Sequence, residues 1–198
     1  MLVTDGQRAS QPLVDLIVAA AAGGVDAIYL RDVDLPVIDL LQLKAQIAER
    51  VPGQVSFLVN GNSERAQTAG MGLQLRERDP MPRAIRFAIG DNLLIGRSVH
   101  SAAGAATSAG ADFLLAGHVF PSRSKPGQPP LGRGGLAAIV AAAPCPVLAI
   151  GGITAERIPD VIDAGAIGVA VIGAIVESDD PQRAAAQLRA AVDLALAK

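Results

Sequence analysis

Short runs of hydrophobic, often β-branched residues alternate along the chain with alanine-rich segments whose apolar positions repeat at helical spacing. The strand-like runs are 2–4, 27–31, 55–60, 72–75, 93–99, 113–119, 146–152 and 168–173. The helix-like segments are 11–23, 36–50, 62–70, 101–110, 133–142, 155–164 and 181–197. This alternation is typical of βα units that build a parallel sheet covered by helices. Eight strands in 198 residues predict an α/β chain that forms a single (β/α)8 TIM barrel over residues 1–198.

The connections between these runs refine the prediction. Glycine follows the helix-like segments in 22–26, 108–112 and 163–166, where a left-handed residue commonly ends a helix. The connection at 78–90 is the weakest, because Pro80 and Pro82 indicate a short or irregular element there. A doubly wound open sheet is the alternative architecture. It would place a glycine fingerprint after the first strand, and the sequence has none there.

Composition and charge exclude several classes of function. Hydrophobic residues make up 51% of the chain, which is enough for a large core. The net charge of −2 gives no electrostatic footprint for nucleic acid, and no basic run indicates a membrane surface. No apolar stretch reaches 18 residues and no signal peptide is recognised, so we expect a soluble, cytoplasmic protein. Barrels of this size often pair, and the sequence leaves a homodimer open.

The polar residues that close the predicted strands are the first candidates for a site, because the strand ends face the active site of such barrels. Arg31, Asn60, Ser98 and His118 end strands that are otherwise apolar. Arg31 is suited to bind an anionic substrate group through its planar guanidinium. The neighbouring Asp32 is open to three interpretations: ion-pair partner of Arg31, helix cap or general base.

A phosphate site is predicted after the seventh and eighth strands. Gly151 and Gly152 end one strand, and Ile172 and Gly173 end the next. Glycine lets an anion approach backbone N–H groups, and a following helix N-terminus adds a favourable dipole. These two loops form the usual phosphate site of the fold, so we expect a small phosphorylated ligand there.

The long polar segment at 121–132 and two histidines complete the candidates. Loops of this length in a compact barrel often serve function, and Lys125 could close over a phosphate from it. Whether the loop is a lid is left open. His118 titrates near neutral pH and is suited to proton transfer, whereas His100 begins a helix and is equally suited to a structural role. No Cys, His or carboxylate spacing indicates a metal site.

Together these residues resemble the thiamine phosphate synthase superfamily over nearly the whole chain. The matching stretches are 94–101, 117–121, 125–126, 130–132, 149–153 and 168–172. The superfamily has two main branches on one barrel and one phosphate site. Its synthases join a pyrimidine pyrophosphate to thiazole phosphate with Mg²⁺, and its thiazole tautomerases move a proton within thiazole phosphate carboxylate without a metal.

Several positions depart from the synthase pattern. Val33 stands where synthases carry lysine, and Gly61 stands where they carry an aspartate associated with Mg²⁺. The other such carboxylate aligns with Asp79, and Arg76 stands where synthases commonly carry glycine. His118 replaces a proline of the synthases and matches the proposed acid/base of the tautomerases.

These departures lead to an isomerase prediction. We expect a thiazole tautomerase that acts on a small phosphorylated thiazole, with His118 as the catalytic residue and no cofactor. The predicted substrate-binding residues are Arg31, Asn60, Ser98, Lys125, Gly151, Gly152, Ile172 and Gly173. One alternative is a thiamine phosphate synthase, for which Mg²⁺ would be needed. The other is a non-catalytic protein that binds phosphorylated ligands for regulation.

Overall fold

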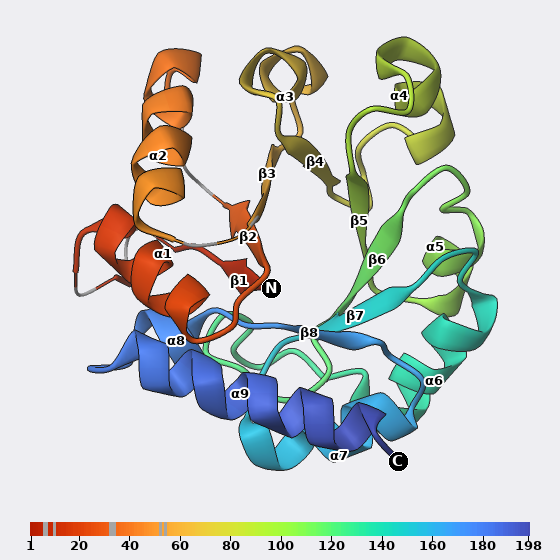
Figure 1. Ribbon diagram of the computed structural model, residues 1–198. Coiled ribbons are helices and arrows are strands. Elements are labelled where there is room, and N and C mark those ends of the chain that lie inside the picture. The colour runs from red at the N-terminus through yellow and green to blue at the C-terminus, as the bar shows by residue number, and fades with distance from the viewer. Residues whose placement is uncertain (6–7, 10, 32–34, 52, 54) are drawn as a thin grey trace.

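A computed structural model describes residues 1–198 except 6–7, 10, 32–34, 52 and 54. Its eight strands form one parallel sheet in which each strand pairs with the next in chain order, from β1 to β8. A parallel bridge between Leu2 and Val171 joins the last strand to the first. Val3 N–H donates to the Val171 carbonyl at 2.9 Å across the same junction. The sheet therefore closes into a (β/α)8 barrel, which confirms the predicted fold class (Figure 1).

The strands alternate with helices, as the hydrophobic pattern predicts. The strands are β1 (Leu2–Val3), β2 (Ala27–Leu30), β3 (Ser56–Asn60), β4 (Gly72–Leu75), β5 (Ile95–Val99), β6 (Phe113–Gly117), β7 (Val147–Ile150) and β8 (Gly168–Ala170). The helices are α1 (Leu13–Ala22), α2 (Val37–Arg50), α3 (Ser63–Ala69), α4 (Pro82–Ile89), α5 (Ala102–Ala106), α6 (Gly132–Ala142), α7 (Ile158–Asp163), α8 (Gly173–Val176) and α9 (Pro181–Leu196). A 3₁₀ turn, η1 (Ala155–Arg157), precedes α7.

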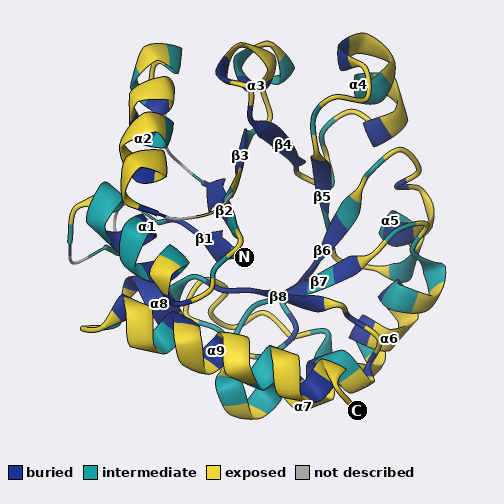
Figure 2. Cartoon of the chain, viewed as in Figure 1, coloured by how far each residue is buried: buried dark blue, intermediate teal, exposed yellow. Residues whose placement is uncertain are grey.

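Two layers of apolar side chains hold the barrel together. The larger one lies between the strands and the helices and includes the fully buried Leu2, Leu16 and Ile28. The smaller one joins residues of five strands inside the barrel, among them Tyr29 and Leu115. Strand residues therefore have buried faces on both sides, while the outer faces of the helices are exposed (Figure 2). This two-sided burial explains why the strands are continuous apolar runs.

Two elements differ from the sequence prediction. The 78–90 connection contains a regular helix, α4, with Pro82 at its first turn. Proline is favoured there because the first helical N–H needs no intrahelical partner, so the proline marks the start of a helix. After β8 comes α8, a helix of four residues that was not predicted. Its macrodipole is correspondingly small, and any anion site beside it depends on individual N–H groups and cations.

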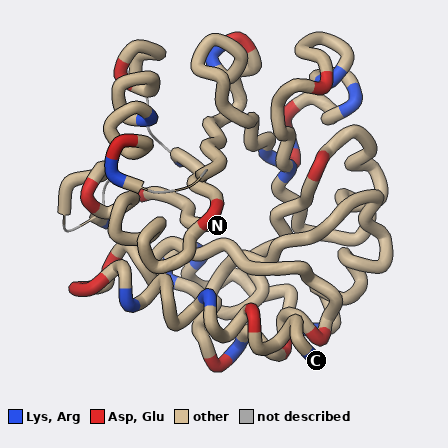
Figure 3. Tube along the Cα trace, viewed as in Figure 1, with Lys and Arg blue, Asp and Glu red and all other residues tan. Residues whose placement is uncertain are grey.

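Charged positions lie mainly on the outer helices and loops, with basic and acidic residues interspersed (Figure 3). Within the described residues, no helix combines the length and the hydropathy needed to cross a membrane.

Candidate functional site

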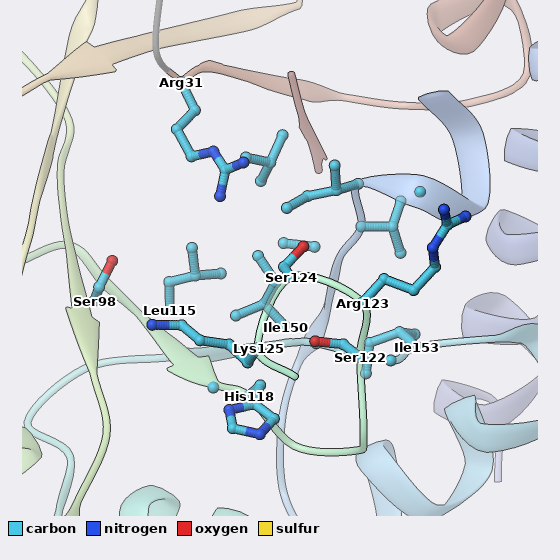
Figure 4. Close-up of a pocket in the computed structure, with 18 of the residues that line it drawn as sticks. Arg31, Ser98, Leu115, His118, Ser122, Arg123, Ser124, Lys125, Ile150 and Ile153 are labelled. Atoms are coloured by element: carbon cyan, nitrogen blue, oxygen red, sulfur yellow. The ribbon is translucent and has the colours of Figure 1, made fainter. Parts of the chain in front are cut away.

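A cavity of about 980 Å³ opens at the carboxyl ends of the strands. Ligand pockets commonly measure about 300–1,000 Å³, so this one is at the upper end of the range. It brings together every residue that the sequence assigned to the site: Arg31, Asn60, Ser98, His118, Lys125, Gly151, Gly152, Ile172 and Gly173. In Figure 4, Arg31 points into the pocket from one side, His118 lies on the other, and the segment with Ser124 and Lys125 passes between them.

The two glycines after β7 have backbone conformations that other residues rarely adopt. Gly151 has φ +100° and Gly152 has φ +65°. A Cβ on Gly151 would lie 2.4 Å from the His118 Cβ, and one on Gly152 would lie 2.5 Å from the Pro121 carbonyl oxygen. Both positions require glycine because the loop after β6 packs directly on the loop after β7.

Two arginines that were not predicted as site residues lie against the glycines of the loops after β7 and β8. Arg157 donates from Nη1 to the Gly152 carbonyl oxygen at 2.6 Å. A Cβ on Gly173 would lie 2.8 Å from Arg8 Nη2, so the Arg8 guanidinium covers the start of α8. The N–H of Gly152 donates no hydrogen bond to another described backbone group. This end of the pocket therefore combines an available N–H donor with two cations, which suits a phosphate.

A cluster of ion pairs and hydrogen bonds joins the loop after β6 to Arg8 and Glu177 at the phosphate end of the pocket. Arg8 binds Glu177 and donates to the Ser124 hydroxyl at 3.0 Å, and Arg123 Nη1 lies 3.0 Å from Glu177 Oε2. The hydrogen bond from Arg8, with the charges of Arg8 and Arg123, holds the pKa of Glu177 below its usual range. The cluster therefore holds the segment that carries Lys125 at the edge of the pocket.

The two histidines occupy different environments. His118 is half-buried in the pocket wall, follows a cis peptide bond, and donates from Nε2 to the Gln128 carbonyl oxygen at 3.3 Å. His100 donates from Nδ1 to the Gly117 carbonyl oxygen, because a carbonyl can only accept. The His100 ring thus fixes the end of β6, and this contact favours the structural role left open for it.

Asn60 and Ser98 each contact a neighbouring strand inside the barrel. The Tyr29 hydroxyl donates to the Asn60 side-chain oxygen, and Gln74 Nε2 donates to the Ser98 hydroxyl at 3.2 Å. These bonds orient both side chains at the floor of the pocket and form a polar arc across β2 to β5 that could hold a heteroaromatic ring.

Arg31 is positioned by the end of β1. Its Nη2 lies 2.9 Å from Asp5 Oδ2, and its backbone N–H donates to Thr4 Oγ1 at 3.1 Å. Asp32 and Val33, which follow Arg31 on this loop, lie outside the described residues, so the three interpretations of Asp32 stay open.

A second group of cations lies on the loop after β4. Arg76 and Arg78 line the pocket, and the buried Arg97 holds this loop by donating from Nη2 to the Glu77 carbonyl oxygen at 2.9 Å. Four of these lining residues were not predicted from the sequence: Arg8, Arg76, Arg78 and Arg157. Extending the strand-end rule over the three or four residues after each strand would have found Arg8, Arg76 and Arg78.

Comparison with known proteins gives the chemistry of similar chains. A family model described as thiamine monophosphate synthase matches residues 1–175. The thiamine-phosphate synthase of Mycobacterium tuberculosis is 37% identical over 98% of this chain and 94% of its own length. That of Methanoculleus marisnigri is 42% identical over 88% of this chain and 85% of its own length. Thiamine phosphate pyrophosphorylase from Pyrococcus furiosus superposes with a TM-score of 0.83 at 32% identity, covering 98% of this chain and 95% of that one.

These relatives contradict the tautomerase prediction. Proteins that match nearly the whole chain at 37% and 42% identity are named synthases, which agrees with the alternative that the sequence left open. The isomerase prediction was wrong because it gave a few positions, His118 and Gly61 above all, more weight than the similarity of the whole chain.

Proposed function

The chain belongs to the thiamine monophosphate synthase family, and we propose that it is a transferase that joins a pyrimidine diphosphate to thiazole phosphate. One observation supports this reaction most strongly. Seven lining residues of the pocket are Lys or Arg, and two are Glu. They lie at both ends of a cavity of about 980 Å³, which offers room for two ring substrates and cations for a phosphate and a diphosphate.

The proposed reaction is a substitution at carbon. The thiazole ring nitrogen donates its electron pair to the methylene carbon of the pyrimidine and forms a C–N bond. The C–O bond to the diphosphate breaks, and its electron pair leaves on the diphosphate oxygen. The protein binds both substrates in line and stabilises the charge that develops on the leaving group.

The substrates have a natural orientation in this pocket. We place the thiazole phosphate on Gly151, Gly152, Ile172 and Gly173, beside Arg8, with Lys125 above it. The diphosphate then lies toward Arg31 and the loop after β4, and the polar arc with Asn60 and Ser98 faces the rings. A homodimer and a cytoplasmic location remain predictions.

Magnesium does not fit the described residues after β3 and β4. Gly61 has no side-chain ligand atom, and both oxygens of Asp79 accept hydrogen bonds from Arg76. We therefore derive no step through a metal and assign the charge of the leaving diphosphate to the arginines.

His118 contributes a hydrogen bond to substrate in this proposal and transfers no proton, because the substitution creates a quaternary nitrogen and removes no proton. We expect His118→Asn to lower kcat/KM by at most about tenfold, the cost of one ordinary hydrogen bond. A loss of about 10²–10⁴-fold, together with loss of one limb of the pH–rate profile, would instead indicate proton transfer. Steady-state kinetics over a range of pH, with thermal unfolding as a control for folding, makes the distinction.

Product analysis tests the proposed function. The protein is incubated with pyrimidine diphosphate and thiazole phosphate together, with each substrate alone, and with the non-aromatic thiazole tautomer alone. We expect thiamine phosphate only when both substrates are present. Conversion of the tautomer without formation of thiamine phosphate, or binding of the substrates without any turnover, would contradict the transferase.

A further inference from the structure

Arg76 and Asp79 form an ion pair at the end of the pocket assigned to the diphosphate. The Arg76 backbone N–H donates to Asp79 Oδ2 at 2.8 Å. Its side chain binds the same carboxylate through Nε, 3.1 Å from Oδ1, and through Nη2, 3.0 Å from Oδ1. The Asp79 side chain is 10% exposed, whereas that of Arg76 is 57% exposed and lines the pocket.

Burial opposes ionisation of Asp79, but the hydrogen bonds and charge of Arg76 outweigh it and hold the pKa of the carboxyl below its usual range. The carboxylate is therefore ionised and neutralised inside the protein. Three hydrogen bonds, one from the Arg76 backbone N–H to Oδ2 and one from Nε to each oxygen, occupy most of the sites at which the two carboxylate oxygens accept bonds. Little of this carboxylate remains for a metal ion.

The Arg76 guanidinium also borders residue 61 across the loop. A Cβ on Gly61 would lie 3.7 Å from Asp79 Oδ2 and 3.7 Å from Arg76 Nη2. The guanidinium thus fills the space in which a carboxylate at position 61 and Asp79 would share a cation. The loop is held in place from below, because Arg97 is 4% exposed and donates to the Glu77 carbonyl oxygen.

We propose that the Arg76 guanidinium takes the place of a divalent cation, so that this chain binds diphosphate without Mg²⁺. The proposal rests on the proposed function, because diphosphate is the leaving group of that reaction. Nε and Nη2 of Arg76 face Asp79, while Nη1 makes no hydrogen bond with the described residues. This outer edge and the adjacent Arg78 present N–H donors to the pocket, where planar guanidinium groups can bind phosphate oxygens in pairs.

Binding of inorganic diphosphate, measured by calorimetry in excess EDTA and in excess Mg²⁺, tests the proposal. We expect the wild-type protein to bind in both buffers with dissociation constants within about threefold. Arg76→Ala is expected to weaken binding in EDTA by at least about tenfold. Arg83→Ala is the matched control, since it removes an exposed arginine from α4 that does not line the pocket; its binding should equal that of the wild type.

A double variant, Gly61→Asp with Arg76→Gly, tests whether removing the guanidinium and adding a carboxylate makes diphosphate binding depend on Mg²⁺. Aspartate tolerates the φ of +43° at position 61 better than most residues. Two carboxylates would then face each other without a guanidinium between them, and we expect diphosphate binding to become at least about tenfold tighter in Mg²⁺ than in EDTA. Thermal unfolding confirms that this variant is folded before it is measured.

Three results would overturn the proposal: wild-type binding that requires Mg²⁺, an Arg76→Ala variant that binds like Arg83→Ala, or a folded double variant that gains no dependence on Mg²⁺. Assaying thiamine phosphate formation in EDTA and in Mg²⁺ distinguishes a failure of the Arg76 proposal from a failure of the proposed function. Formation of product only with Mg²⁺ would contradict the role proposed for Arg76 but would leave the transferase in place. Absence of product in both buffers would contradict the transferase.

Discussion

Replacing Gly152 with alanine is expected to lower kcat/KM for thiamine phosphate formation by at least about 10²-fold. The new Cβ would lie 2.5 Å from the Pro121 carbonyl oxygen and 2.9 Å from the Phe120 carbonyl oxygen, so the loops after β6 and β7 must separate. The proposed phosphate cradle lies on these loops, and a displacement of about 1 Å is enough for a loss of this size. The φ of +65° adds strain of about 1–3 kcal/mol to the folded state.

The chain offers a matched control for this collision. Gly132 has φ +63°, nearly the same conformation, but a Cβ there would meet nothing within 4 Å. Gly132→Ala should therefore show only the loss of stability that comes from the backbone strain, measured by denaturant unfolding, and retain most of its activity. Equal activities of the two alanine variants would contradict the role given to the loop after β7.

Replacing Arg31 with alanine is expected to lower kcat/KM for the pyrimidine diphosphate by about 10–100-fold, the effect of losing a charge-assisted hydrogen bond to a phosphate. Arg31 points into the pocket (Figure 4), and its Nη2 is held 2.9 Å from Asp5 Oδ2. The guanidinium is therefore oriented before substrate binds. Arg31→Lys should recover only part of the loss, because an ammonium keeps the charge but cannot form the paired hydrogen bonds.

Steady-state kinetics of Arg31→Ala beside Arg50→Ala checks this prediction. Arg50 is an exposed arginine of α2 that pairs with Asp15 and does not line the pocket. Its variant should keep wild-type activity. If both variants lose the same activity, or neither does, Arg31 has no specific part in binding substrate.

The barrel could be predicted from the sequence because the hydrophobic pattern of each βα unit is local and repeats along the chain. Each strand is an apolar run buried on two sides, and each intervening helix carries an apolar face at helical spacing. The sequence left open whether 78–90 is a short helix or an irregular element, because a proline can either break a helix or begin one, and in α4 Pro82 begins it. The four residues of α8 are too few to show a period.

The position of the strand-end residues in the candidate site was also predictable, whereas their chemical role was not. Residues that end parallel strands meet at one face of a barrel whatever their identity, so Asn60, Ser98 and Gly151 could be placed together before any side chain was positioned. Arg157 could not, because it lies in η1, beyond the residues that directly follow β7, and its guanidinium reaches back to the Gly152 carbonyl oxygen only in the folded loop. The choice of reaction failed for another reason: His118 is compatible with proton transfer and with binding a phosphate, and residue type alone does not distinguish these roles.

The most direct test of the transferase follows the release of inorganic diphosphate and the formation of thiamine phosphate in one reaction of the wild-type protein. We predict that one diphosphate is released for each thiamine phosphate formed, and that release stops when thiazole phosphate is omitted. Diphosphate release without thiazole phosphate, or no release with both substrates present, would contradict the account.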